Sequence, residues 1–156
     1  MGKNDHLVVF SLDNCKYALN LPSVARVIPS VAVTPLPEAP PIILGVIKIR
    51  EKIIPVVNIR KRFHLPEREL GLNDQIIIAK TNKRAVGLVV DSVAGVEEHD
   101  HLRTITKEKI LPSLKYVEGI IQMEDGLVLI HDLDQFLSLE EEHALEEAME
   151  KERNAK

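Results

Sequence analysis

The chain has 156 residues, a formal net charge of −4 at pH 7 and one cysteine. This length is typical of one domain, and the negative charge with only 3% aromatic residues argues against a dedicated nucleic-acid binder. The single cysteine excludes an intramolecular disulfide, and no apolar run approaches the roughly 18 residues of a membrane-spanning helix. We therefore expect a cytoplasmic protein without membrane insertion.

The first half of the chain predicts two pairs of strands. Residues 7–12 and 15–21 form the first pair around the turn residues Asp13 and Asn14. Apolar residues at positions 24, 27 and 28 predict a short helical turn, and the proline-rich stretch TPLPEAPP predicts an extended connector because proline donates no ladder hydrogen bond. The apolar runs ILGVIKI and IIPVVNI then predict a hairpin with a charged tip, followed by another helical turn.

The second half predicts the same order of elements. Residues 75–81 and 85–90 read as strand, turn and strand, residues 91–96 as a helical turn, and residues 119–123 and 127–133 as a second hairpin. The polar stretch 97–115 is expected to be rich in loops. From Ser138 onward, Ser138 and Glu141 fit a capping box, so residues 138–156 are expected to form a charged helix that docks weakly and frays at its end.

The two halves also resemble each other in sequence. YALNLPSVARVI (17–28) aligns with VGLVVDSVAGVE (86–97), and GVIKIREKIIPVVNI (45–59) aligns with GIIQMEDGLVLIHDL (119–133). Such a repeat predicts two similar β units, about 7–65 and 74–137, within one domain that spans 7–137. The surface between the units is a natural candidate for a binding site.

The sequence gives little support for catalytic or metal-binding residues. His99 and His101 resemble a metal pair, but a third ligand is not evident, so a solvated loop is the preferred interpretation. His131 and Asp132 are neighbours in a strand and point to opposite faces, and Cys15 has no nearby His or Asn. With no phosphate-binding glycine loop or nucleophile motif, we expect no enzyme, no metal and no cofactor.

Two basic features of the sequence have a structural and a functional interpretation. The run Arg60-Lys61-Arg62 is interpreted as a solvated end of a helical turn rather than a phosphate contact. Arg50 lies at the tip of an apolar hairpin, where it is either an ordinary turn charge or a guanidinium presented to a partner.

Two segments resemble the signature of the CheW family. LPEAPPIILGVIKIREKIIPVVNIRKRF (36–63) matches its proline connector followed by GVINLRG and IPVVDLR, and DQIIIAKTNKRAVGLVVDSVAGV (74–96) resembles its second-half segment. The likeness covers about residues 7–137. Two departures stand out: Glu51 replaces the usual glycine, and Asn58 replaces a common aspartate.

The resemblance implies a mainly β fold with two SH3-like five-stranded β-barrel subdomains, short helices and a C-terminal helix. It implies a non-enzymatic adaptor of bacterial chemotaxis, which couples the cytoplasmic signalling tip of chemoreceptors to the regulatory domain of the histidine kinase CheA. The residues carried over as the receptor groove are Val8, Leu21, Val24, Val27, Val93 and, as a polar contact, Arg50. Those carried over for the kinase are Glu51, Ile53, Ile54 and Val56.

Three alternatives remain open at this point. One is a small regulatory β-barrel domain that binds a small ligand. Another is a CheW-like coupling protein of a non-flagellar chemosensory pathway. The third is an enzyme that uses a metal at His99 and His101.

Overall fold

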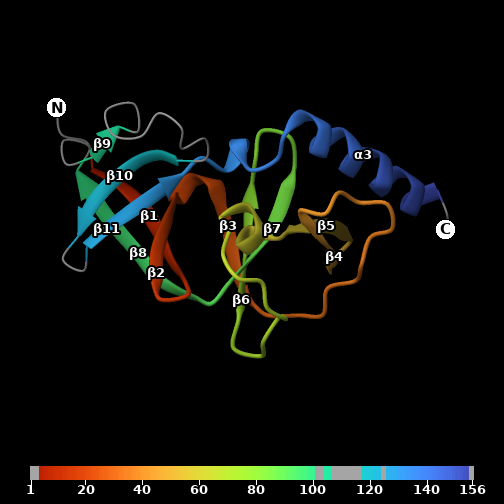
Figure 1. The fold of residues 1–156 in the computed structure, drawn as a ribbon, viewed down its shortest axis with the longest axis horizontal. Coiled ribbons are helices and arrows are strands. Elements are labelled where there is room, and N and C mark those ends of the chain that lie inside the picture. Colours follow the sequence, from red (N-terminus) through yellow and green to blue (C-terminus); the bar gives the residue numbers. More distant parts are fainter. Residues whose placement is uncertain (1–3, 101–103, 107–116, 124–125, 155–156) are drawn as a thin grey trace.

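The computed structural model describes residues 4–100, 104–106, 117–123 and 126–154, and these residues form two β-sheets that lie next to each other (Figure 1). The six-stranded sheet has the order β8 (Ser92–Asp100), β1 (Asn4–Leu12), β2 (Cys15–Asn20), β11 (Gly126–His131), β10 (Val117–Met123) and β9 (Thr104–Thr106). The five-stranded sheet has the order β3 (Val24–Pro29), β6 (Gln75–Lys80), β7 (Ala85–Val90), β5 (Lys52–Val57) and β4 (Ile43–Ile49). The short helical elements are η1 (Leu21–Ser23), α1 (Ile59–Arg62) and η3 (Leu133–Gln135), and α3 (Leu139–Asn154) follows them.

The mainly β fold, the hairpins, the turn after Asn58 and the C-terminal helix confirm the predicted fold class. The first sheet has one strand more than the five expected, because the short β9 pairs with β10. Among the described helices, none is long and apolar enough to cross a membrane.

The repeated halves of the chain exchange strands between the two sheets. Each half supplies its first two strands to one sheet (β1 and β2, or β6 and β7) and its remaining strands to the other. The first strand of each half then pairs with the third strand of the other half, as β1 does with β8 and β6 with β3. Each sheet is therefore assembled from both halves of the chain.

The third strand of each half was predicted as a helical turn, and this prediction is wrong. Only Leu21–Ser23 is helical, and Val24–Pro29 is β3. The equivalent segment in the second half is β8, which also extends through residues 97–100 of the predicted loop. The strand conformation comes from long-range pairing with the other half, which the local spacing of apolar residues does not reveal.

Turn chemistry explains the first hairpin. Asp13 and Asn14 have φ angles of 50° and 68°, and Leu12 pairs with Cys15 across them. Two consecutive positive φ angles are required by the two-residue turn that matches strand twist, and Asp and Asn tolerate them best after glycine.

The connector before β4 explains the glycine of the GVIKI motif. Thr34 exchanges backbone hydrogen bonds with Val46, at N···O distances of 2.9 and 2.7 Å. A Cβ atom on Gly45 would lie 2.2 Å from the Thr34 carbonyl oxygen, and Gly45 has a φ of 155°. Only glycine lets the connector lie this close to the strand.

The hydrophobic core has a central part and two flanking parts. The central cluster joins the two sheets and includes Phe10, Leu19, Ile77 and Leu88. A second cluster lies within the six-stranded sheet and a third within the five-stranded sheet, at the opposite faces of their strands. The two sheets therefore share one core, and their relative position is fixed by apolar packing.

The C-terminal helix docks on the side of the five-stranded sheet (Figure 1). The predicted capping box is present: the Ser138 amide donates to Glu141 Oε1 at 2.8 Å, and the Glu141 amide donates to Ser138 Oγ at 3.1 Å. Leu145 is fully buried in the central core, and Arg62 pairs with Glu141 at 2.6 Å. The helix is therefore held by burial and by charge, more firmly than its narrow apolar stripe suggested.

Candidate partner-binding surface

β3 and β8 each lie at one edge of their sheet and pair with the other half of the chain, and we call them the crossover strands. No residue of β3 is fully buried, although the strand contains two valines and an isoleucine. Val27 is 36% exposed, and its counterpart in the sequence repeat, Val96, is 54% exposed. Exposed apolar side chains at equivalent positions of the two strands make this surface a candidate for partner binding.

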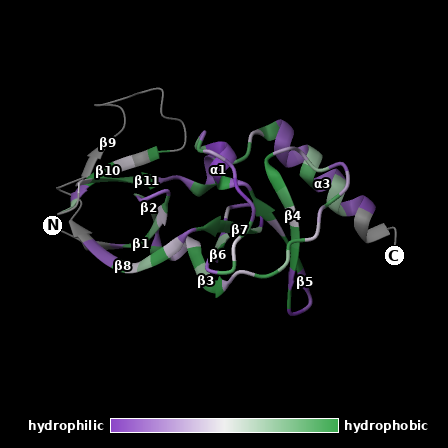
Figure 2. Ribbon diagram, turned by 60° about the horizontal axis from the view of Figure 1, so that its bottom comes forward, coloured by the Kyte–Doolittle hydropathy of each residue, from purple (hydrophilic) through white to green (hydrophobic). Residues whose placement is uncertain are grey.

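The crossover strands meet at Gln75. This residue pairs with Pro29 of β3, and its side-chain Oε1 accepts a hydrogen bond from the Val93 amide of β8 at 2.8 Å. Val24 and Val93 pack against the central core, whereas Val27 and Val96 face solvent. Figure 2 shows both strands along the lower side of the molecule. The inner valines thus anchor the strands and the outer ones are free for a partner.

The other residues predicted for the receptor groove lie in three different settings. Leu21 is half-buried in η1, which contacts β1. Val8 is only 3% exposed and lies in β1 between Leu19 and Val96, so it supports the surface from below. Arg50 is at the tip of the β4–β5 hairpin, and the strand order places that hairpin at the opposite edge of the sheet from β3.

The backbone at Arg50 is unusual. Arg50 has a φ of 57° and its side chain is exposed. It begins the two-residue turn between Ile49 and Lys52, where the left-handed region favours glycine over arginine. Residues held in such a conformation cluster at functional sites, because the strain persists only where another requirement keeps the side chain.

The residues predicted for the kinase contact separate by burial. Ile54 is 5% exposed and Val56 is fully buried, both within the core of the five-stranded sheet. Their side chains are therefore not available on the surface of this structure. Glu51 is exposed and Ile53 is 44% exposed, so these two are the accessible members of the set.

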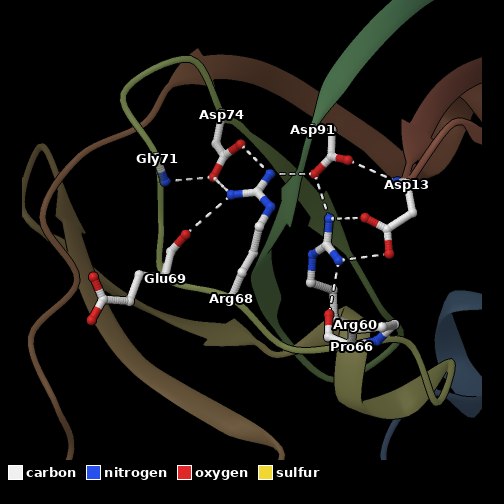
Figure 3. A network of polar contacts seen from close by, with 8 residues as sticks. All are labelled: Asp13, Arg60, Pro66, Arg68, Glu69, Gly71, Asp74 and Asp91. Carbon is white, nitrogen blue, oxygen red and sulfur yellow. Dashed lines mark hydrogen bonds and ion pairs between the residues drawn. The ribbon is translucent and has the colours of Figure 1, made fainter.

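A polar network holds the point at which the chain passes from β7 in the five-stranded sheet to β8 in the six-stranded sheet (Figure 3). Arg60 donates to Asp13 at 3.0 Å and to Asp91 at 2.8 Å, and Arg68 also pairs with Asp91. Arg68 makes a second, two-bonded contact with Asp74 at 2.7 and 2.9 Å. Asp91 lies between β7 and β8, so the network joins this connection to the β1–β2 turn and to α1.

The network shifts the ionisation of its carboxylates. The guanidinium of Arg68 hydrogen-bonds Asp74 and lowers the pKa of that carboxyl, against the opposing effect of burial. Burial disfavours the charged form of Asp91, but hydrogen bonds from the Asp13 amide and from Arg60 and Arg68 outweigh it and lower its pKa. Both carboxylates therefore stay ionised at neutral pH, and the network remains fully charged.

The interpretation of Arg60-Lys61-Arg62 as a solvated run is wrong for two of its members. Arg60 is 8% exposed and belongs to the network, and Arg62 pairs with Glu141 of α3. Lys61 alone is exposed. The partners of Arg60 are far away in sequence, at positions 13 and 91, so the local run gave no signal of the network.

The remaining candidates take structural positions. His131 ends β11, is buried, and stacks on Phe63 with ring centroids 4.3 Å apart. Cys15 is exposed at the start of β2. The side chains of His99 and His101 lie outside the described residues, and the described part of the chain contains no group of three possible metal ligands.

Comparison with known proteins places this fold in a family. The model of the CheW-like domain matches residues 6–142. The chain belongs to the CheW-like domain family. It is 25% identical to "Chemotaxis protein CheW" of Treponema pallidum over 90% of this chain and 88% of that protein. It is 29% identical to the protein of the same name from Thermotoga maritima, over 86% and 89% of the two chains.

A solved CheW structure agrees with the described fold. The crystal structure of the scaffolding protein TtCheW from Thermoanaerobacter tengcongensis matches with a TM-score of 0.81 and 31% identity, over 89% of this chain and 96% of that one. The predicted family is thus confirmed, and with it the class of protein, a non-enzymatic scaffold.

Proposed function

We propose that this CheW-like domain is an adaptor that couples the cytoplasmic signalling tip of a chemoreceptor to the regulatory domain of a CheA-type histidine kinase. The observation that carries the proposal is the exposed apolar surface of the crossover strands, centred on Val27 and Val96. An amphipathic helical hairpin needs such a stripe of small apolar side chains, into which its own apolar face can pack.

The polar network supports this role from beneath the surface. Arg60 and Arg68 bind Asp91, so the chain passes from β7 to β8 at a fixed point. A preformed surface loses little conformational entropy when a partner binds. The adaptor acts in the cytoplasm, and its two partners bind different surfaces of one rigid scaffold.

The kinase contact is proposed at the β4–β5 hairpin, through Glu51 and Ile53. Ile53 is an exposed apolar residue beside a charged turn, at the opposite edge of the five-stranded sheet from β3. The two sites are therefore far enough apart in the strand order for both partners to bind together.

The test is a binding experiment with purified partners. The chain is mixed with a receptor cytoplasmic fragment, with a CheA regulatory domain, and with both. The proposal expects two binary complexes and one ternary complex at moderate salt. Failure to bind either partner would overturn it, and competition between the partners would overturn the assignment of separate sites.

A further inference from the structure

A cavity of about 340 Å³ lies between the β6–β7 turn, η3 and the beginning of α3. Its apolar lining includes Val57, Val86, Leu133 and Phe136, all four of which are buried in the fold. Its polar lining includes Asn82, Lys83, Asp134 and Glu142. The volume is at the lower end of the range for ligand sites, so it suits one small group on a short stem.

Glu142 brings a buried carboxylate to this cavity. Its side chain is 13% exposed, and its Oε2 atom is buried with no hydrogen-bond donor among the described residues. Lys83 Nζ lies 3.9 Å from Oε2 and Arg84 Nε lies 3.8 Å from Oε1, both beyond hydrogen-bond distance. A buried carboxylate oxygen without a donor is energetically costly, which marks it as a place for a donor group to bind.

The sequence repeat shows what fills the corresponding place in the other half of the molecule. Asn58 accepts a hydrogen bond from the Lys61 amide at the start of α1, and its counterpart Asp132 accepts one from the Asp134 amide at the start of η3. The turn between the first two strands of each half contacts this helical element. Asp13 of the β1–β2 turn pairs with Arg60 of α1, and the Asn82 amide of the β6–β7 turn donates to Asp134 of η3 at 2.8 Å. The two junctions are thus built alike.

These two contacts, of α1 with the β1–β2 turn and of η3 with the β6–β7 turn, are the two junctions, and they differ in the charge of their central residue. In the first, the guanidinium of Arg60 bridges the carboxylates of Asp13 and Asp91 (Figure 3). In the second, the residue aligned with Arg60 is Asp134, and the cavity lies beside it. The second junction therefore offers carboxylates to an open space, where the first junction contains an arginine.

We propose that this cavity binds a guanidinium group carried on a short apolar stem. The guanidinium donates hydrogen bonds to Glu142 and Asp134, as Arg60 does to Asp13 and Asp91, and the stem packs on the apolar lining. A planar guanidinium suits two carboxylates because its donors form a fixed fork. The proposal is independent of receptor and kinase binding, because the cavity lies on neither proposed surface.

The experiment is a titration of the isotope-labelled full chain with butylguanidinium, followed by amide shifts in NMR spectra. Shifts are expected at residues 81–84 and 133–142, with a dissociation constant of about 1 mM or weaker for so small a ligand. Butanol and butyrate are the controls for the stem and for the opposite charge, and both should bind more weakly. A capped arginine tripeptide that binds at least about tenfold tighter indicates a peptide source of the group, and equal binding indicates a free small molecule.

Three variants make the test specific, each checked for folding by circular dichroism. Glu142→Gln should weaken binding about tenfold or more, because a charge-assisted hydrogen bond is lost. Lys83→Met should strengthen binding, because it removes a cation that competes for Glu142 Oε2. Glu147→Gln, on an exposed part of the same helix, should leave binding unchanged.

Several results would overturn the proposal. One is the absence of amide shifts at a butylguanidinium concentration about a hundredfold above the expected dissociation constant. The others are equal or tighter binding of butyrate, and unchanged binding to the Glu142→Gln variant. Weaker binding of butylguanidinium to Lys83→Met would contradict a cation site in which Lys83 competes for Glu142. A bound water molecule without any response to butylguanidinium would show that Glu142 is satisfied by solvent alone.

Discussion

At the scale of the residue, burial separates side chains that the sequence groups together. Val24 and Val27 lie in one short strand, but Val24 packs against the central core whereas Val27 is 36% exposed. The same difference separates Val93 from Val96 in the other half. The outer valines are therefore the proposed contacts of this surface, and the inner valines support it.

A charge at Val27 should impair receptor binding without unfolding the chain. Val27→Asp is expected to weaken binding about tenfold or more, since an unpaired charge in an apolar interface is costly. Its unfolding free energy should change by about 0.5 kcal/mol or less, as for other exposed positions. Leu127→Asp is the matched control, because Leu127 is 60% exposed but outside the crossover strands. Equal receptor affinity for the Val27 variant and the wild type would contradict the proposed surface.

Replacement of Arg50 by glycine should raise the stability of the chain and lower its affinity for its partners. Arg50→Gly is expected to stabilise the chain by about 1 kcal/mol, because glycine adopts the φ of 57° without strain. Arg50→Ala should be nearly neutral, since alanine keeps the strain. Urea unfolding measures both, and both variants should lose affinity in the ternary assembly. A destabilised glycine variant would show that the arginine side chain has a structural role instead.

At the scale of the element, the crossover strands depend on what holds their ends. β8 begins beside Asp91, which pairs with both Arg60 and Arg68. The Val93 amide of β8 donates a hydrogen bond to Gln75. β3 is bounded by η1 before it and by the connector after it. The exposed apolar surface is thus carried by strands that are fixed by polar contacts at one end and by core packing along their length.

Acid should weaken the network. The pKa values of Asp74 and Asp91 are lower in the folded chain than in the unfolded chain. Their contribution to the free energy of unfolding is therefore complete above the unfolded pKa of about 4. It is lost as the pH falls through the lower pKa values of the folded chain. Urea unfolding should give a steady free energy from neutral pH to about pH 5 and a decline below about pH 4.

Asp91→Asn is the variant that isolates this effect. It should cost about 3 kcal/mol at neutral pH, because Arg60 is almost fully buried and loses a charged partner. Its stability should then fall less steeply below about pH 4 than that of the wild type. Parallel pH curves for the two proteins would contradict the assignment of the acid response to the network.

At the scale of the whole molecule, the exchange of strands makes the two sheets one folding unit. Each sheet takes two strands from one half of the sequence and the rest from the other. The central cluster contains residues of both halves, such as Phe10 and Leu88, so neither sheet has a complete core without the other half. The two sheets therefore hold the proposed binding surface in one arrangement.

Splitting the chain tests this arrangement. A fragment of residues 1–70 and one of residues 71–156 should each remain largely unfolded alone, because each lacks the pairing partners of its edge strands. Mixed together, they should regain the circular dichroism and the amide dispersion of the intact chain. An independently folded fragment would show that the interleaved pairing is not required.

Local chemistry in the sequence was enough to predict much of this protein. The turn at Asp13 and Asn14, the hairpins, the capping box at Ser138 and the family all follow from residues that are neighbours in the chain or form short motifs. The mainly β fold follows because branched apolar side chains favour strands. The repeat indicated two related units, but not that they exchange strands.

The tertiary structure decided the features that depend on distant partners. Residues 24–29 and 92–100 become strands because they pair with β6 and β1, which no local pattern contains. Arg60 leaves the solvent because Asp13 and Asp91 meet it from far along the chain. Burial, long-range pairing and charge neutralisation are properties of the assembled chain. The residues of the proposed binding surface and of the cavity at Glu142 therefore come together only once the two sheets are in place.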